Sequence, residues 1–123
     1  MPASTLQIVE RNAGSGVVVL TLSGEITLDD GDLEFGRRID DLGARGSHQI
    51  IVDLAGVTYI DSAGVGMMTA MLKDVRKRGG DIRLLRLNPQ GHRLFGVLKL
   101  KATFELYDDE AAALRSFEFR PRG

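Results

Sequence analysis

The chain has 123 residues, of which 43% are hydrophobic and 27% are charged, and its formal net charge is −1. This size and composition predict one folded domain with a substantial core and exclude a disordered tail, and the balanced charge excludes a global attraction to nucleic acid or anionic lipid. No apolar run reaches the roughly 18 residues that a membrane span needs, and the lack of cysteine excludes disulfides and thiolate metal sites.

The first half of the chain predicts a hairpin, a helix and a buried strand. Residues 6–9 and the β-branched run 17–22 are two strands, which the glycine-containing link at residues 12–16 joins as a hairpin. Residues 32–44 carry apolar side chains among charges, which favours an amphipathic helix that ends at nearby glycines. Residues 50–54 form a short continuous apolar run, typical of a strand that is buried on both faces.

A second helix is predicted to begin near Ser62 and to end at the glycine pair 79–80. Its apolar residues recur every three or four positions, which places them on one face of the helix. These residues are Val65, Met68, Leu72 and Val75. Basic residues near the end supply the polar side and favour the C-terminal end of the helix dipole.

The last third of the chain predicts two further pairs of a strand and a helix. Residues 82–85 are a strand, and the Asn-Pro pair at 88–89 opens the next helix, since proline is favoured in a first turn. Residues 104–107 are a last short strand, and the Asp-Asp pair at 108–109 caps a terminal helix that extends through Phe117. This alternation predicts an α/β fold with a four- to five-stranded mixed β-sheet and about four α-helices packed against it.

The most informative segment is residues 52–66, where a strand ends near Leu54 and a helix begins near Ser62. Ser62 lies where the free N–H groups and the positive end of the helix dipole point outward. Gly64 and Gly66 fall in the first helical turn, where each costs roughly 0.5–1 kcal/mol relative to alanine. Glycine leaves that turn bare, so another backbone or a partner surface can approach it closely.

The residues alone leave two interpretations of this segment open. Asp61 and Ser62 are both favoured N-cap residues, and capping is the stronger interpretation of the pair, although a cap can also be modified. The glycines serve either tight packing of the helix on the sheet or access of a partner to the helix start. In the loop after the second strand, Thr27 is expected to cap the next helix, and Asp29 either shares that task or contributes to a surface.

This segment and its flanks resemble the signature of the STAS domain, the family of bacterial anti-sigma factor antagonists. The matching residues are Leu-Ser-Gly-Glu-Ile at 22–26, Ile-Val-Asp-Leu at 51–54, Ile-Asp-Ser-Ala-Gly-Val-Gly at 60–66, Leu-Leu-Arg-Leu-Asn-Pro at 84–89 and Glu-Ala at 110–111. Asp-Ser-Ala-Gly alone is a weak signal, and its specificity comes from the flanking elements. The resemblance implies a single STAS domain over residues 1–123, with a core of about residues 6–117.

Members of this family are partner-switching proteins rather than enzymes. The resemblance implies that the unphosphorylated chain binds an anti-sigma factor that is also a serine protein kinase, and so frees a sigma factor. The resemblance also implies that the kinase phosphorylates a serine at the helix start, which the motif places at Ser62, and that the complex then dissociates. A phosphatase is expected to remove the phosphate and so to restart the cycle. Many members carry two hydroxyl residues after the aspartate, whereas Ala63 follows Ser62 here, so a modification of the second position is impossible in this chain. The implied partner-binding residues are Gly24, Glu25, Thr27, Asp29, Asp61, Ser62, Ala63, Gly64, Val65 and Gly66.

The sequence gives less support to other functions. An enzyme would need a base beside Ser62, but His48 and His92 stand in no catalytic or metal-binding pattern and are expected to be solvated; no cofactor or metal is expected. The basic run at 73–78 is a solvated helix face, so direct nucleic-acid binding is not expected. The chain start lacks a secretory signal, which predicts a cytoplasmic protein without membrane insertion. The alternative within the family is a non-switching STAS subunit of a lipid-transport or stress-sensing complex.

Overall fold

The computed structural model describes residues 6–27 and 30–118 as five strands and four helices. In chain order these are β1 (Gln7–Asn12), β2 (Val17–Ile26), α1 (Asp30–Ala44), β3 (Gln49–Ile60), α2 (Ser62–Lys77), β4 (Asp81–Leu85), α3 (Pro89–Val97), β5 (Glu105–Tyr107) and α4 (Glu110–Glu118). Each predicted element is present, and the α/β class is confirmed.

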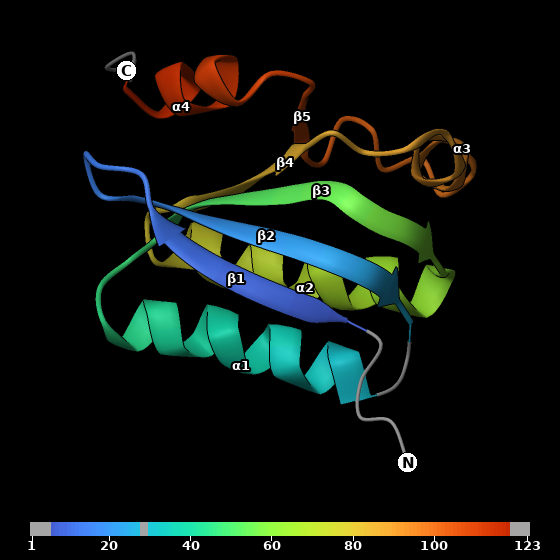
Figure 1. The fold of residues 1–123 in the computed structure, drawn as a ribbon, viewed down its shortest axis with the longest axis horizontal. Helices are drawn as coiled ribbons and strands as arrows, with labels where there is room; N and C mark the ends of the chain where they lie inside the picture. Colours follow the sequence, from blue (N-terminus) through green and yellow to red (C-terminus); the bar gives the residue numbers. More distant parts are fainter. Residues whose placement is uncertain (1–5, 28–29, 119–123) are drawn as a thin grey trace.

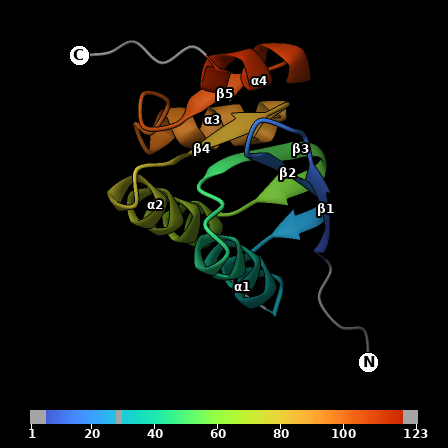
Figure 2. The same ribbon diagram turned by 90° about the vertical axis from the view of Figure 1, so that its left-hand side faces the viewer.

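The strands lie in one mixed sheet, side by side in the order in which they occur along the chain. β1 and β2 are antiparallel, and every later pair of neighbours is parallel. Figure 1 shows α1 and α2 on one face of the sheet and α4 on the other, and Figure 2 shows the same layers from the side. α3 packs beside β3. Because β2 and β3 run in parallel, both strands end at the same edge of the sheet, where α2 begins (Figure 1).

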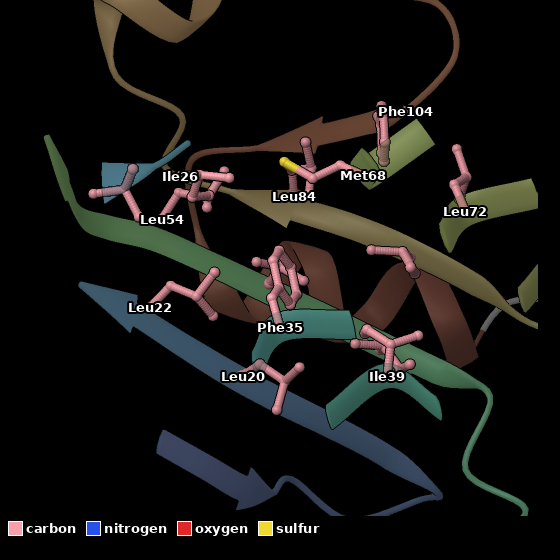
Figure 3. Packing of buried hydrophobic residues seen from close by; sticks show 14 of the residues in the cluster. Leu20, Leu22, Ile26, Phe35, Ile39, Leu54, Met68, Leu72, Leu84 and Phe104 are labelled. Atoms are coloured by element: carbon pink, nitrogen blue, oxygen red, sulfur yellow. The ribbon is translucent and has the colours of Figure 1, made fainter. Parts of the chain in front are cut away.

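The main core lies between the sheet and helices α1 and α2. Figure 3 shows Phe35 and Ile39 of α1 over the strands of the sheet, and Met68 and Leu72 of α2 belong to the same cluster. The α2 residues predicted to share one face are all buried in it: Val65, Met68, Leu72 and Val75. Burying each such aliphatic side chain stabilises the fold by about 1.5–3 kcal/mol. This face therefore fixes α2 on the sheet, and with it the position of its first turn.

A smaller core lies on the opposite face, beneath α4. Ala113 and Phe117 pack there against residues of the central strands, namely Val17, Val19, Ile51 and Leu85. α4 covers only part of this face. Toward the ends of β2 and β3 the same face carries exposed side chains, including Glu25 and Tyr59, the latter 45% exposed.

β3 is longer than the sequence predicts, because its pairing with β2 continues to Ile60 instead of ending at residue 54. Two irregularities in the β2–β3 register each insert one extra residue into β3. With these bulges, Leu54, Val57 and Ile60 all face the main core although they are three residues apart. Apolar residues that recur every three positions do not show the apolar–polar alternation that predicts a strand. The predicted end of this strand at residue 54 is therefore wrong.

His48 is not the solvated residue that the sequence predicts. Its Nδ1 atom is buried and has no hydrogen-bond partner among the residues that the structure describes. The His48 carbonyl accepts a hydrogen bond from the Asp81 N–H at 2.9 Å, and a methyl group at Gly80 would collide with that carbonyl. The backbone of residue 80 therefore lies directly against that of His48. His92 is also partly buried, on α3.

Candidate functional site

The start of α2 is held by an aspartate cap. Asp61 is extended (φ −99°, ψ 173°), and its Oδ1 accepts a hydrogen bond from the Gly64 N–H at 2.7 Å. The Asp61 N–H donates to the carbonyl of Ile26, at the end of β2, at 3.1 Å. Such a cap satisfies an N–H group that the helix itself cannot pair. The capping interpretation is therefore confirmed for Asp61, which also ties the helix start to β2.

Ser62 and Ala63 occupy the first two positions of α2, and both side chains are exposed. Since Asp61 supplies the cap, the Ser62 hydroxyl has no capping role, and no hydrogen bond to it is found within the described part of the chain. The free N–H groups and the positive dipole end at this point stabilise negative charge. The position of Ser62 therefore combines an accessible hydroxyl with surroundings that tolerate a phosphate.

The two glycines of this turn lie in different surroundings. A methyl group at Gly64 would lie 2.5 Å from the Ile26 carbonyl oxygen, so tight packing of helix on sheet explains this glycine. A methyl group at Gly66 would meet no atom within 4 Å beyond its own helix backbone, and Gly66 is exposed, so the access interpretation stays a prediction for this glycine. The expectation that Val65 contacts a partner needs correction, because its side chain is fully buried in the main core. Gly64 is buried as well.

The end of β2 lies directly beside the residues that lead into α2. Glu25 pairs in register with Tyr59, and Ile26 pairs with Ile60. Both Glu25 and Tyr59 are exposed. The two predicted segments, which are far apart in the sequence, are therefore brought together at one end of the sheet (Figure 1).

The other predicted residues of the β2 segment differ in how they are placed. Gly24 is partly buried, and its carbonyl accepts a hydrogen bond from Thr58 Oγ1 at 3.3 Å. Thr27 is also partly buried. Asp29 lies outside the described residues. Gly24 and Thr27 thus belong to the neighbourhood of the site, with less exposure than Glu25.

Two amide side chains at this end of the sheet were missed by sequence reasoning. Asn88 caps α3, since its Oδ1 accepts from the Gly91 N–H at 2.7 Å, and its Nδ2 also donates to the Val57 carbonyl at 3.1 Å. Gln90 accepts a hydrogen bond from the Ile60 N–H through Oε1 at 3.0 Å and donates to the Ile60 carbonyl through Nε2 at 2.7 Å. The Asn-Pro pair signals a helix start, but no pattern in the sequence indicates contacts with β3.

We refer to the exposed residues at this end of the sheet together as the α2-start surface: Glu25, Tyr59, Ser62, Ala63 and Gly66. Among the residues that the structure describes, no group of three or more His, Asp or Glu side chains could hold a metal ion. No helix in the same residues has the length and apolar character needed to cross a membrane.

Comparison with known proteins agrees with this architecture. The family model described as STAS domain matches residues 9–113, and the chain belongs to this family. The chain is 27% identical over 110 residues to an anti-sigma F factor antagonist of Paenibacillus polymyxa, which covers 89% of this chain and 94% of that protein. It is 36% identical over 53 residues to an anti-sigma-B factor antagonist of Bacillus subtilis, which covers 43% of this chain and 49% of that protein.

Solved structures share the fold. An anti-sigma factor antagonist from Mycobacterium paratuberculosis superposes with a TM-score of 0.81 at 22% identity, covering 96% of this chain and 100% of that chain. The Bacillus cell fate determinant SpoIIAA in its phosphorylated form superposes with a TM-score of 0.70 at 21% identity, covering 89% of this chain and 99% of that chain. The mixed sheet and four helices therefore match the architecture of anti-sigma factor antagonists.

Proposed function

We propose that this chain, as a single STAS domain over residues 1–123, is an anti-sigma factor antagonist that works by partner switching in the bacterial cytoplasm. Its α2-start surface binds an anti-sigma factor that is also a serine protein kinase, and this releases a sigma factor. The kinase then phosphorylates Ser62, the complex dissociates, and a phosphatase restores the hydroxyl. The chain itself is no enzyme, needs no cofactor and does not touch nucleic acid. Its family and the names of its relatives support this proposal.

The observation that carries the proposal is the exposed Ser62 side chain at the first position of a helix that Asp61 already caps. A phosphate on Ser62 would add about −1.5 to −2 charges and three acceptor oxygens. At a helix N-terminus this charge is well tolerated. We therefore expect phosphorylation to change the surface while leaving the fold intact.

A partner fitted to the neutral hydroxyl would meet a charge that it has to desolvate. Glu25 and Asp61 lie at the same end of the sheet, so the added phosphate increases a negative potential that is already present there. A loss of about 1.4 kcal/mol lowers affinity tenfold. We expect a charged group at Ser62 to weaken the complex by at least about tenfold.

Capture of partners from a lysate of the source bacterium tests this switch, with wild type, Ser62→Ala, Ser62→Asp and Ser15→Asp as baits. Ser15 is the matched control, because it is exposed in the β1–β2 turn at the opposite end of the sheet. Its φ of 55° is a conformation that aspartate tolerates. Wild type, Ser62→Ala and Ser15→Asp should recover a kinase-like ATPase, and Ser62→Asp should not.

The recovered ATPase is then purified, its affinity for each variant is measured by calorimetry, and the phosphorylated residue is mapped by mass spectrometry after incubation with Mg-ATP. All variants should unfold within about 2 °C of wild type, since no buried contact is changed. Equal affinity of the partner for wild type and Ser62→Asp would contradict partner switching. That result would support the alternative, a non-switching subunit of a transport or stress-sensing complex.

A further inference from the structure

We propose that Gln90 is a positioning residue for Ser62, and that it couples the charge state of Ser62 to α3. This role rests on the proposed function, because it concerns the regulation of the same serine. It assigns a task to a side chain that the partner-switching cycle does not otherwise use.

The end of β3 lacks a neighbouring strand on one edge. β3 pairs with β2 as far as Ile60, but it pairs with β4 only as far as Asp53. Beyond Asp53, the edge that faces away from β2 has no strand beside it within the described residues. Unpaired backbone groups at such an edge need partners when water is excluded.

Gln90 takes the place of the missing strand. Its Oε1 accepts from the Ile60 N–H at 3.0 Å, and its Nε2 donates to the Ile60 carbonyl at 2.7 Å. A carboxamide offers the same donor and acceptor as a peptide group, so this pair of bonds reproduces one rung of a β-ladder. Two further bonds run from Asn88 Nδ2 to the carbonyls of Val57 and Thr58 at 3.1 and 3.3 Å. The start of α3 therefore clamps the last four residues of β3.

The clamp acts directly on the segment that carries Ser62. Ile60 precedes Asp61, and on its other side it pairs with Ile26, whose carbonyl accepts the Asp61 N–H. Ile60 is thus held between β2 and the first turn of α3. A small shift of the α2 start caused by charge at Ser62 would reach α3 most directly through Gln90, because within the described residues Gln90 is the side chain that is hydrogen-bonded to the Ile60 backbone, whereas Asn88 bonds to Val57 and Thr58.

Nuclear magnetic resonance on the 15N-labelled chain of 123 residues tests the coupling without any partner. Spectra of wild type and Ser62→Asp are compared, and the same comparison is made in a Gln90→Ala background and in a Gln7→Ala background. Gln7 is the matched control, since it is an exposed glutamine on the edge strand β1. Hydrogen exchange of the Ile60 amide is measured in each variant.

In the wild-type and Gln7→Ala backgrounds, the substitution Ser62→Asp should shift the resonances of the Gln90 side chain and of the α3 backbone amides. In Gln90→Ala the α3 shifts should fall by at least half, and the Ile60 amide should exchange about tenfold faster, the change expected when one net hydrogen bond is lost. If Gln90→Ala does not fold, Gln90→Glu replaces it, because glutamate keeps an acceptor for the Ile60 N–H and loses the donor to the Ile60 carbonyl.

The inference would be overturned if Ser62→Asp caused the full α3 shifts in the Gln90→Ala background. It would also be overturned if Ser62→Asp caused no α3 shifts in the wild-type background. These outcomes are independent of the partner experiment. If the α3 shifts depend on Gln90 but no partner distinguishes wild type from Ser62→Asp, the positioning role of Gln90 stands and the proposed function is refuted. If a partner does distinguish them but the α3 shifts do not depend on Gln90, the proposed function stands and the positioning role is refuted.

Discussion

Replacing Gly64 by alanine would place a methyl group 2.5 Å from the carbonyl oxygen of Ile26 and 2.9 Å from its Cγ2. Since carbon atoms do not approach an oxygen this closely, the helix start has to move away from the end of β2. The same carbonyl accepts the Asp61 N–H at 3.1 Å, so that bond is strained as well. Overpacking costs about 1–3 kcal/mol, and the gain in helix propensity returns about 0.5–1 kcal/mol. We expect a net loss of about 1–2 kcal/mol.

Gly66→Ala is the matched control, because the same substitution two residues further along α2 meets no atom within 4 Å. Only the propensity gain of about 0.5–1 kcal/mol remains there. For a chain of this size, 1 kcal/mol corresponds to roughly 3–5 °C in Tm. Thermal unfolding should therefore show a fall of about 3–10 °C for Gly64→Ala and a rise of about 2–5 °C for Gly66→Ala. Shifts of the same sign would refute the packing argument.

Two further predictions concern the face that α4 partly covers. Burial, and next a hydrogen bond to Glu105, raise the pKa of the Tyr107 hydroxyl above its ordinary value. A raised folded-state pKa gives stability that is complete below about pH 10 and is lost as the pH rises further, so Tyr107→Phe should flatten the alkaline fall in Tm. Arg86→Asn tolerates the φ of 61° but removes the Nη1 donor at 3.0 Å from the buried Asp53 carboxylate. Urea unfolding should show that Arg86→Asn lowers the free energy of unfolding by about 1–3 kcal/mol. The control Lys73→Ala, on the exposed side of α2, should lower it by less than about 0.5 kcal/mol. Equal losses in the two variants would contradict a stabilising role of the Arg86–Asp53 pair.

The helices and the continuous apolar strands could be predicted because their periodicity is local. The α2 stripe that begins with Val65 is visible in the sequence, and so is the start of the helix at Ser62. The second half of β3 could not be predicted, because two bulges set Leu54, Val57 and Ile60 three residues apart. Those bulges depend on the pairing with β2, which no short window of sequence contains.

The candidate site divides in the same way. The motif identified the start of the helix. Only the position of Ile26 in the fold shows that Gly64 is packed against the sheet whereas Gly66 is exposed. The contact of Gln90 with Ile60 could not be predicted, because it depends on where β4 ends and on how α3 then crosses to the free edge of β3. Such contacts are tertiary, and their residue types are common on any helix start.

The strand order has a consequence for how the chain folds during synthesis. Each strand pairs with the one that precedes it in the sequence, so the sheet grows from β1 to β5 without waiting for a distant segment. Every pairing can form as soon as the next strand leaves the ribosome, and short sequence separations favour rapid folding. The central pair β2–β3 and helix α2 can therefore assemble early, whereas the clamp from α3 can close on Ile60 only after α3 has emerged.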